Sequence, residues 1–381
     1  MRVLQLGKFY EPVVGGIETH LRLLSEGLAA SGVEVEVLVH HTERMTVRGT
    51  VRGVPVTRVG SFGRLLSADL SPGLIGELSR PFDVLHLHVP HPVGMLAYLM
   101  SRKPRHALVV THHSDIVKQA RLRSALAPLF RSVMSRAGAV ISTSERYLAS
   151  SAELVPYRAK VRVIPYGIDL SAFTPSLRES AKAQEIRARY RGPLLLAAGR
   201  LIYYKGFDVL LDAMKAVRGH LLLVGDGPLR EELTSQARRN GIHERVTFVG
   251  NVPNAEMGAY YGAADLFVLP SVARSEAFGI VQIEAMASGL QVVNTALASG
   301  VPGVSLDGVT GSTVEPNNPS VLAEALTGLL DDPDRRARFA VAARERAMEF
   351  FTSRRMVADT LALYQSLLTV PERRTPSVRT A

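Results

Sequence analysis

Short apolar segments alternate with longer amphipathic segments along most of the chain. The first apolar segment covers residues 2–7, apolar residues with helical spacing follow at about 17–30, and residues 34–40 form the next apolar segment. This order predicts a strand, a helix and a second strand. Because the strand segments are almost continuously apolar, they indicate parallel strands that helices bury on both faces.

The same pattern fills the rest of the chain in two similar halves. In the first half we expect further strands at 83–89, 107–113 and 139–144 and helices at 93–101 and about 121–137. A turn-rich stretch follows at 161–175, and after it the apolar segments resume at 193–200, 220–227, 245–251, 265–271 and 290–295. The sequence therefore predicts an α/β fold with two parallel sheets.

The length agrees with two domains, because 381 residues exceed what one hydrophobic core usually supports. We predict a first domain at 1–172, a second at 173–355, a helix at 356–370 that packs back toward the first domain, and a disordered tail at 371–381. Open parallel sheets bind ligands beyond the carboxyl ends of their strands. Two facing sheets therefore predict a ligand site in the cleft between the domains.

Composition narrows the location and the chemistry. The chain has no cysteine, which excludes disulfides, thiolate zinc sites and cysteine nucleophiles. The first apolar segment reaches Gly7 and Lys8 too early for a signal peptide, and no apolar stretch approaches the roughly 18 residues that span a bilayer. We expect a cytoplasmic protein, either soluble or peripheral on the inner face of the cytoplasmic membrane.

The net charge indicates an anionic partner. Lys and Arg number 45 against 35 Asp and Glu, a formal net charge of +10, which suits a nucleic acid, a lipid surface or a phosphorylated substrate. Aromatic residues make up only 6%, tryptophan is absent, and no nucleic-acid-binding motif is present. We therefore expect no nucleic acid partner.

Two carboxylates stand out in the segment EAFGIVQIEAMASG, residues 276–289, which is otherwise small or apolar. If a helix runs from about Phe278 to Ser288, Glu276 lies in the loop before it and Glu284 about two turns inside it. Backbone amides at the start of such a helix can bind a phosphate, and Gly279 permits close approach. The alternative is structural, with Glu276 capping the helix and Glu284 pairing with a surface arginine.

Seven segments in this order resemble the retaining glycosyltransferases of family 4, also called group 1. They are PVVGGIETH, FDVLHLHVPHP, THHSD, VIPYGID, GRLIYYKGFD, VGDGP and EAFGIVQIEAMASG, and the resemblance covers roughly residues 1–368. That family has the GT-B architecture, in which two Rossmann-like domains face each other. The segments HHSDIVKQ and ASGVPGVSLDGVTG resemble the branch that transfers mannose or rhamnose in bacterial polysaccharide assembly, as for O-antigen or exopolysaccharide.

The resemblance implies a retaining hexosyltransferase. Its donor would be a nucleotide-sugar, first of all GDP-mannose, with GDP-rhamnose or a UDP-sugar as alternatives, and its acceptor a saccharide carried on a lipid such as a polyprenyl. The first domain would bind the acceptor and the second the nucleotide, without a metal or another cofactor. Two other classes stay open: a non-catalytic protein that binds nucleotide-sugars, and a sugar phosphorylase.

The resemblance also implies roles for single residues. Glu276 would accept hydrogen bonds from the donor sugar and Glu284 from the ribose hydroxyls. Arg200 and Lys205 follow an apolar strand and would stabilise the leaving diphosphate, unless they form a solvated loop pair. The expected catalytic group consists of four residues: His113, Glu276, Arg200 and Lys205. The expected donor site contains Gly15, Gly16, Gly225, Val252, Phe278, Gly279, Ile280 and Glu284.

Gly15 and Gly16 lie between the first strand and the first helix. Without side chains they let the backbone approach a phosphate, although a plain tight turn also explains them. They do not form the GxGxxG fingerprint, and no acidic residue is suitably placed on the second strand. A nicotinamide-dependent dehydrogenase is therefore not expected.

The histidines allow several interpretations. His113 aligns best with the family histidine that touches the donor sugar, and His112 is the competing assignment. His88 and Asp115 are candidates for acceptor binding, although Asp115 can equally cap the following helix. Metal binding is conceivable for His86, His88, His91, His112 and His113, but neither an HExxH motif nor a carboxylate partner accompanies them, so we expect no metal site.

Residues 118–136 combine apolar residues at helical spacing with several Lys and Arg residues. Such a basic amphipathic helix can rest on an anionic membrane surface, at about 1 kcal/mol for each positive charge near the lipid. The alternative is a packed helix with a solvated basic face.

Overall fold

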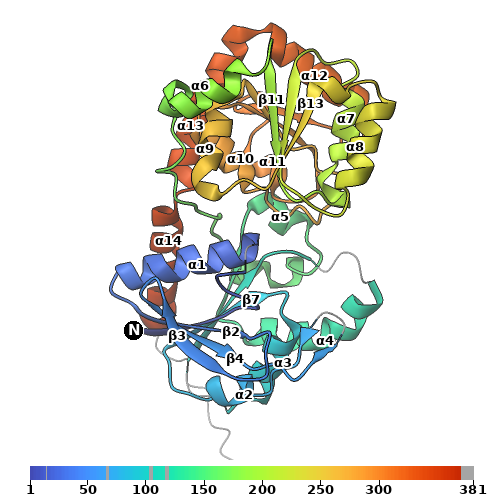
Figure 1. Cartoon of the computed structure of the whole chain (residues 1–381). Coiled ribbons are helices and arrows are strands. Elements are labelled where there is room, and N and C mark those ends of the chain that lie inside the picture. Colours follow the sequence, from blue (N-terminus) through green and yellow to red (C-terminus); the bar gives the residue numbers. More distant parts are fainter. Residues whose placement is uncertain (14, 66–67, 103–105, 116–119, 370–381) are drawn as a thin grey trace, which may run out of the picture.

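The computed structural model describes residues 1–13, 15–65, 68–102, 106–115 and 120–369, except the side chains of 64–65, 68 and 120–123. Two domains lie one above the other in Figure 1, and each consists of a largely or wholly parallel sheet with helices on both faces. The predicted fold class is therefore confirmed.

The first domain contains an eight-stranded sheet with the order β10-β9-β8-β7-β1-β2-β4-β3. Its strands are β1 (Arg2–Leu6), β2 (Glu34–His40), β3 (Val47–Val51), β4 (Val54–Val59), β7 (Val84–Val89), β8 (Ala107–His112), β9 (Ala139–Ser142) and β10 (Val161–Val163). Neighbouring strands are parallel except β3 and β4. A two-stranded hairpin, β5 (Arg64–Leu65) and β6 (Ala68–Asp69), lies outside this sheet.

Helices cover the two faces of the first sheet. One face packs against α1 (Gly16–Ala30) and the last helix of the chain, α14 (Ser353–Thr369). The other packs against α2 (Leu74–Glu77), α3 (Pro92–Met100), α4 (Ala120–Arg136) and α5 (Glu145–Ser150). A short 3₁₀ helix, η1 (Val155–Lys160), follows α5.

The second domain contains a six-stranded, fully parallel sheet with the order β13-β12-β11-β14-β15-β16. Its strands are β11 (Leu194–Ala198), β12 (His220–Val224), β13 (Val246–Gly250), β14 (Leu266–Val268), β15 (Val292–Thr295) and β16 (Gly311–Val314). One face packs against α6 (Ala181–Ala188), α9 (Asn254–Ala263), α10 (Val281–Ala287), α11 (Val301–Val304) and α13 (Pro333–Phe350). The other packs against α7 (Phe207–Ala213), α8 (Arg230–Arg239) and α12 (Pro319–Asp331). Three 3₁₀ helices complete the domain: η2 (Pro175–Glu179), η3 (Tyr203–Lys205) and η4 (His243–Arg245).

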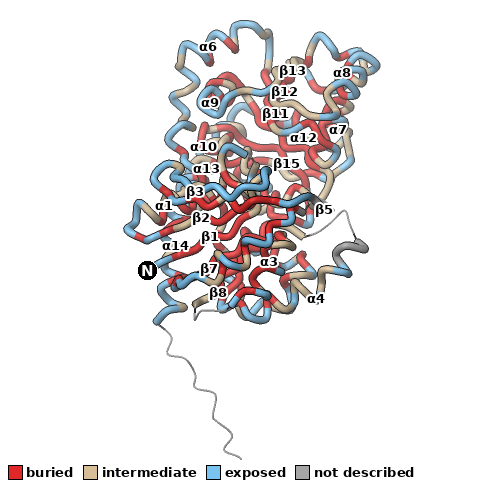
Figure 2. Tube along the Cα trace, turned by 60° about the horizontal axis from the view of Figure 1, so that its bottom comes forward, coloured by how far each residue is buried: buried red, intermediate tan, exposed pale blue. Residues whose placement is uncertain are grey.

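The apolar strand segments are buried on both sides, as the sequence predicts. Successive residues of β11 contribute to different cores: Leu194 and Leu196 belong to one cluster, Leu195 and Ala197 to the other, and all four are fully buried. Figure 2 shows the same buried character along the central strands of both sheets. Every strand predicted from an apolar segment is present.

Two chain segments cross between the domains side by side. Ile168 forms an isolated parallel bridge with Thr352, through hydrogen bonds of 2.9 Å from the Ile168 amide to the Phe351 carbonyl and from the Ser353 amide to the Ile168 carbonyl. Gly167 permits this contact, because a Cβ there would lie 2.2 Å from the Thr352 oxygen. After the crossing, α14 packs against α1 and β8 of the first domain.

The domain limits predicted at 172 and 355 stay predictions, and the tail at 371–381 lies outside the described residues. Among the helices that the structure describes, none combines the length and the apolar character that crossing a membrane requires.

The turn after η3 provides a stability test. Gly206 has φ +67°, and a Cβ there would lie 2.1 Å from the Pro270 carbonyl oxygen, whereas Gly241, with φ +69°, has open space around it. Alanine at either position bears the cost of a left-handed backbone, about 1–2 kcal/mol. Gly206→Ala adds a backbone clash, so its free energy of unfolding should fall by roughly a further 1–3 kcal/mol relative to Gly241→Ala in denaturant titrations. Equal losses in the two variants would show that the Gly206 turn relaxes without cost.

Candidate functional site

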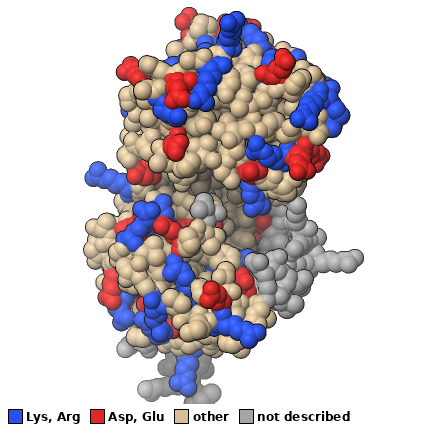
Figure 3. All heavy atoms as spheres, viewed as in Figure 1, with Lys and Arg blue, Asp and Glu red and all other residues tan. Residues whose placement is uncertain are grey.

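A cavity of about 370 Å³ lies between the facing edges of the two domains. Figure 3 shows the recess between the domains from outside. The first domain contributes Gly16, Ile17, His113 and Ser114, and the crossing segment contributes Tyr166. The second domain contributes Tyr204, Lys205, Ser275, Glu276, Ala277, Phe278, Gly279, Ile280 and Val281. Residues expected to act on a donor thus meet at this cavity from both domains.

Lys205 and Glu276 form an ion pair inside the cavity wall. The Lys205 Nζ lies 2.6 Å from the Glu276 Oε2, and their side chains are only 11% and 10% exposed. Ser271 Oγ donates a hydrogen bond to the same carboxylate oxygen at 3.2 Å. Buried charges are stable only when paired, so each of these residues holds the other in place. The capping role predicted as the structural alternative for Glu276 does not apply, because the residue before α10 is Ile280 and none of the described side chains caps this helix.

The helix after Glu276 begins later than predicted. It starts at Val281, and Glu284 therefore lies in its first turn instead of two turns inside. The cause is Gly279, whose φ of +75° is incompatible with a right-handed helix. A Cβ at this position would also lie 2.6 Å from Leu269 Cδ2, so a larger residue would have to displace that buried side chain.

Glu284 is a half-buried carboxylate that accepts a hydrogen bond from the Tyr261 hydroxyl at 2.7 Å. Burial raises the pKa of Glu284 to about 7, although the Tyr261 hydrogen bond partly opposes this shift. No arginine pairs with Glu284 in the described part of the chain, so the predicted surface pairing is wrong. Glu284 lies outside the lining of the cavity itself.

Three further predicted residues follow the carboxyl ends of adjacent strands. Arg200 is exposed after β11, Gly225 directly follows β12 with φ +125°, and Val252 is half-buried after β13. The Gly225 amide donates to the Gly250 carbonyl at 2.8 Å, which ties the ends of β12 and β13 together. None of the three lines the cavity, and neither does Gly15. The three residues lie along the same edge of the sheet as Lys205 and Glu276, but outside the cavity.

Gly16 lies directly opposite the second domain. A Cβ on Gly16 would lie 3.7 Å from the Ile280 Cδ1, so the two predicted donor residues are close across the cavity. Gly15 precedes α1 with extended backbone at φ −173°, and a Cβ there would lie 2.2 Å from a Glu18 carboxylate oxygen.

His113 and His112 point to different parts of the first domain. His113 lines the cavity between the domains, whereas His112 hydrogen-bonds the Tyr147 hydroxyl at 2.9 Å and the Glu153 carboxylate at 3.0 Å. Of the two histidines, only His113 is therefore placed for contact with a donor that occupies the cavity.

A chain of hydrogen bonds supports His113 from behind. It connects, in order, Tyr166, His113, His88, Gln5, Tyr364, His86 and Thr111. The His113 Nε2 lies 2.9 Å from the His88 Nδ1, and the His88 Nε2 lies 2.9 Å from the Gln5 Oε1. Burial lowers the pKa of His86, His88 and His113 far below the usual histidine value, so all three rings are neutral.

This chain argues against the acceptor role predicted for His88. The His88 side chain is 2% exposed, and both ring nitrogens are used within the protein. Strand β7 alternates its side chains between the two faces of the sheet, and His88 points inward toward His113 and Gln5. His88 therefore orients His113 instead of facing the cavity.

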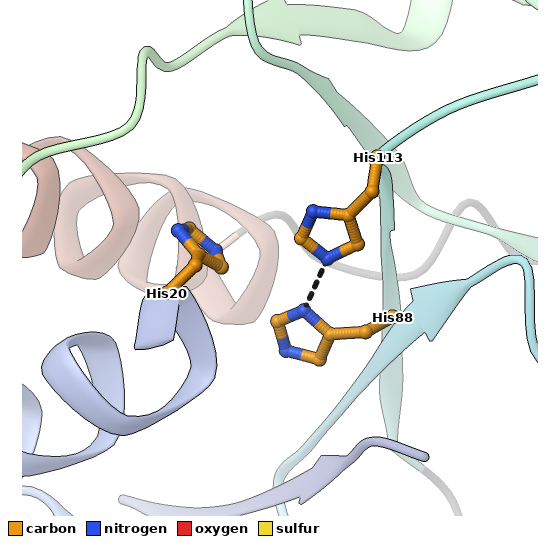
Figure 4. A group of neighbouring side chains, drawn as sticks. All are labelled: His20, His88 and His113. Carbon is orange, nitrogen blue, oxygen red and sulfur yellow. Dashed lines mark hydrogen bonds between the residues drawn. The ribbon is translucent and has the colours of Figure 1, made fainter. Parts of the chain in front are cut away.

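His20 is a residue of this region that the sequence reasoning missed. It lies on α1, is 5% exposed, and neither of its ring nitrogens has a hydrogen-bond partner in the structure. Figure 4 shows its ring beside those of His88 and His113, with centroid distances of 5.6 and 5.2 Å. Burial lowers the pKa of His20 to about 3.

Asp115 joins the two domains. Its carboxylate accepts hydrogen bonds from Ser151 Oγ at 2.6 Å and Tyr147 at 3.1 Å, and it pairs with Arg274 of the second domain at 2.8 Å. Arg274 also donates to the Ser150 carbonyl at 3.0 Å. Residues 116–119 lie outside the described residues, so the helix-capping alternative for Asp115 stays a prediction.

The basic segment predicted at 118–136 is described only in part. Residues 118–119 and the side chains of 120–123 lie outside the described residues. Within the rest of α4, Val133 is fully buried while Arg131 and Arg136 are exposed. A second cavity, about 320 Å³, lies beside this helix and is lined mainly by apolar residues, among them Met95, Leu126, Phe130 and Tyr157.

Comparisons with known proteins cover both domains. Residues 15–167 match the family model described as a glycosyl transferase 4-like domain, and residues 179–346 match glycosyl transferases group 1. The chain is 31% identical to an O-antigen chain mannosyltransferase C of Escherichia coli, over 97% of this chain and 99% of that protein. It is 30% identical to D-rhamnosyltransferase WbpZ of Pseudomonas aeruginosa, over 93% of each protein.

Solved structures show the same fold. A sucrose-phosphate synthase from Thermosynechococcus elongatus superimposes with a TM-score of 0.80 and 24% identity, covering 96% of this chain and 98% of that one. WaaG, a glycosyltransferase involved in lipopolysaccharide biosynthesis, superimposes with a TM-score of 0.68 and 18% identity, covering 97% and 100%. The chain is therefore a glycosyltransferase of GT-B architecture that belongs to group 1, family 4.

Proposed function

We propose that the protein is a retaining glycosyltransferase that moves an α-mannosyl group from GDP-mannose to a saccharide acceptor carried on a lipid. The observation that carries the proposal is the cavity between the domains, where the Lys205–Glu276 pair faces His113 and Gly16. The similarity to an O-antigen chain mannosyltransferase supports mannose as the sugar. GDP-rhamnose is the alternative that the similarity to a D-rhamnosyltransferase supports.

The second domain would bind the donor. Lys205 would neutralise the diphosphate as its charge grows, with Arg200 reaching in from the same sheet edge after donor binding. Glu276 has one carboxylate oxygen bonded to Lys205 and Ser271, so the other oxygen can accept a hydrogen bond from a sugar hydroxyl. Glu284 would accept hydrogen bonds from the ribose hydroxyls when it is ionised.

The reaction would need no enzyme nucleophile. The bond between the sugar anomeric carbon and the phosphate oxygen breaks, and the acceptor oxygen bonds to that carbon from the same face. The acceptor hydroxyl proton passes to the leaving phosphate oxygen, so the diphosphate acts as the base. Glu276, which is held by Lys205, orients the sugar and neither attacks nor protonates it. The chemistry proposed here uses no metal ion.

The acceptor would enter from the first domain. Asp115 lies at the domain interface, and the apolar cavity beside α4 could receive part of a lipid carrier. The exposed Arg131 and Arg136 on α4 and the net charge of +10 favour contact with an anionic lipid surface. We place the enzyme at the cytoplasmic face of such a membrane, where a polyprenyl-linked saccharide is accessible.

Two substitutions of Glu276 should distinguish its role in catalysis from its role in the stability of the fold. Glu276→Gln keeps a hydrogen-bond partner for Lys205 but removes the charge, and we expect turnover to fall about a hundred- to thousand-fold. Glu276→Ala should abolish transfer and also destabilise the fold, because it leaves Lys205 buried and unpaired. Steady-state kinetics check the rate, with the exposed Glu256→Gln as the control. Wild-type turnover in Glu276→Gln would remove Glu276 from the proposed site.

Donor affinity should depend on pH through Glu284. With a pKa near 7, the carboxyl is mostly ionised at pH 8 and mostly protonated at pH 6. If the ionised form binds the ribose, affinity for the nucleotide-sugar falls about tenfold between these pH values. Calorimetry with the intact sugar nucleotide measures this change, because its diphosphate does not titrate in that range. Glu284→Gln should bind more weakly at pH 8 and lose the pH dependence, and a dependence that persists would assign it to another group.

The donor can be identified by thermal unfolding with GDP-mannose, GDP-rhamnose, UDP-glucose and ADP-glucose. A donor at a hundred times its dissociation constant stabilises the folded state by about 2.7 kcal/mol. We expect the largest shift with a GDP-sugar, and its loss in Glu284→Ala. A shift with UDP-sugars alone would keep the fold and reject the proposed donor. Binding without transfer to any acceptor would favour the non-catalytic alternative, and turnover that requires inorganic phosphate would favour a phosphorylase.

A further inference from the structure

Three buried histidines converge at one point of the first domain. His20 comes from α1, His88 from β7 and His113 from the end of β8, and one nitrogen of each lies within 4.8 Å of the others. All three side chains are at most 5% exposed. Figure 4 shows the rings of His88 and His113 connected by a hydrogen bond, with the ring of His20 beside them.

The outer nitrogens of two of these rings are already anchored. The His88 Nε2 bonds to the Gln5 Oε1 at 2.9 Å, and the His113 Nδ1 bonds to the Tyr166 hydroxyl. Gln5 is itself held by its amide nitrogen, which donates to Tyr364 at 3.1 Å. The inner nitrogens, His88 Nδ1 and His113 Nε2, therefore face each other in fixed orientations. Outer-shell partners of this kind orient the histidines of protein metal sites.

His20 completes the group, because no residue that the structure describes satisfies its ring nitrogens. Both of its ring nitrogens are buried without a hydrogen-bond partner in the structure. Leaving a buried polar group unpaired is costly, and a native structure rarely tolerates it without a reason. The ring is positioned by contact with Tyr166, at a centroid distance of 4.7 Å, and not by a hydrogen bond.

We propose that His20, His88 and His113 bind a divalent transition metal ion, with zinc as the best match. Three neutral imidazoles suit zinc, copper or nickel. Bonds of about 2.0–2.1 Å to zinc place the nitrogens roughly 3.4 Å apart, so binding requires the three nitrogens, now within 4.8 Å of one another, to adopt this spacing. The site lacks a carboxylate, so a water or an anion from the adjoining cavity would be the fourth ligand. A second cluster, His112, Asp115 and Glu153, is less suitable because Asp115 already pairs with Arg274.

Metal binding would change the tautomer of His113 but not the number of protons that the three histidines carry. The Gln5 Oε1 can only accept, so the neutral His88 carries its proton on Nε2. In the metal-free protein the His113 Nε2 therefore donates its proton to the His88 Nδ1. When both nitrogens bind the metal, that proton moves to the His113 Nδ1, where the Tyr166 oxygen accepts it in a hydrogen bond. His88 keeps its proton on Nε2, bonded to Gln5. No net proton is gained or lost by the three histidines.

The metal would not be a cofactor of the proposed reaction. His113 lines the cavity between the domains, so an ion that holds its ring changes the surface offered to a donor. Zinc should therefore inhibit the metal-free enzyme, a consequence that rests on the proposed function. Metal binding itself does not rest on it and is measured separately.

The test is zinc titration of the full-length chain without a histidine tag, after treatment with a chelator, followed by calorimetry. We expect one zinc ion per chain. His20→Phe keeps an aromatic ring and removes both nitrogens, so affinity should fall more than a hundredfold. His243→Phe, the same substitution at an exposed histidine, should bind zinc as the wild-type chain does. Tyr166→Phe, which removes one outer-shell partner, should weaken binding about tenfold.

Each outcome decides the proposal. Zinc binding that is unchanged in His20→Phe and Tyr166→Phe would overturn it, as would the absence of saturable binding to the wild-type chain. Circular dichroism of each variant shows whether the fold is retained. Zinc should also raise the unfolding temperature of the wild-type chain but not that of His20→Phe. Transfer activity is a separate readout, so failure of the proposed donor leaves the zinc result intact.

Discussion

The site depends on a geometric constraint of parallel sheets. All strands of such a sheet end at one edge, so the loops that follow them gather there. In the second domain this edge collects Arg200 and Lys205 from one loop, together with Gly225 and Glu276 from distant parts of the sequence. In the first domain it collects Gly16 and His113. Since the two edges face each other, the cavity between them is lined by both halves of the chain.

Charge in the cavity is concentrated in one buried pair. Lys205 and Glu276 satisfy each other at 2.6 Å, and Ser271 supplies a further hydrogen bond. His113 on the opposite wall is neutral, because burial disfavours its charged form. One wall thus offers a cation and a carboxylate, while the other offers a neutral ring. Within the described lining, the cation that could contact an anionic ligand, Lys205, therefore belongs to the second domain.

Much of the fold could be predicted because the central strands are apolar on both faces. The same criterion missed β3, which is mostly exposed, and β16, GSTV, which is half polar. The strands β4 and β10 and the hairpin of β5 and β6 were not predicted either. The start of α10 could not be placed, because the sequence does not reveal that Gly279 adopts a positive φ. In the two main sheets the missed strands lie at an edge or next to an edge strand, so the predicted α/β fold class is unaffected.

The sequence identified the residues of the site better than their contacts. Motifs indicated Glu276 and Lys205, but the ion pair between them depends on how two loops fold back on the sheet edge. His20 was missed because it lies on a helix, away from the histidines of the strands. A signal was present: His20 falls four residues before Leu24 and eight before Leu28, on the buried stripe of α1. A polar residue on the buried face of a helix requires a hydrogen-bond partner or a functional role.

The paired crossing segments limit which relative motions of the two domains would keep their hydrogen bonds. Two backbone hydrogen bonds tie Ile168 to the chain around Thr352, so a rotation that keeps both bonds would have to pivot near these residues. A rotation of one domain about this point would preserve both hydrogen bonds, whereas sliding one domain along the other would break them. Lys205 and Glu276 belong to the same domain, so such a rotation would keep their ion pair. Contacts between the domains, such as that of Arg274 with Asp115, would break and form again. Opening the cleft by such a rotation would therefore separate the two walls of the cavity and leave the Lys205–Glu276 ion pair intact.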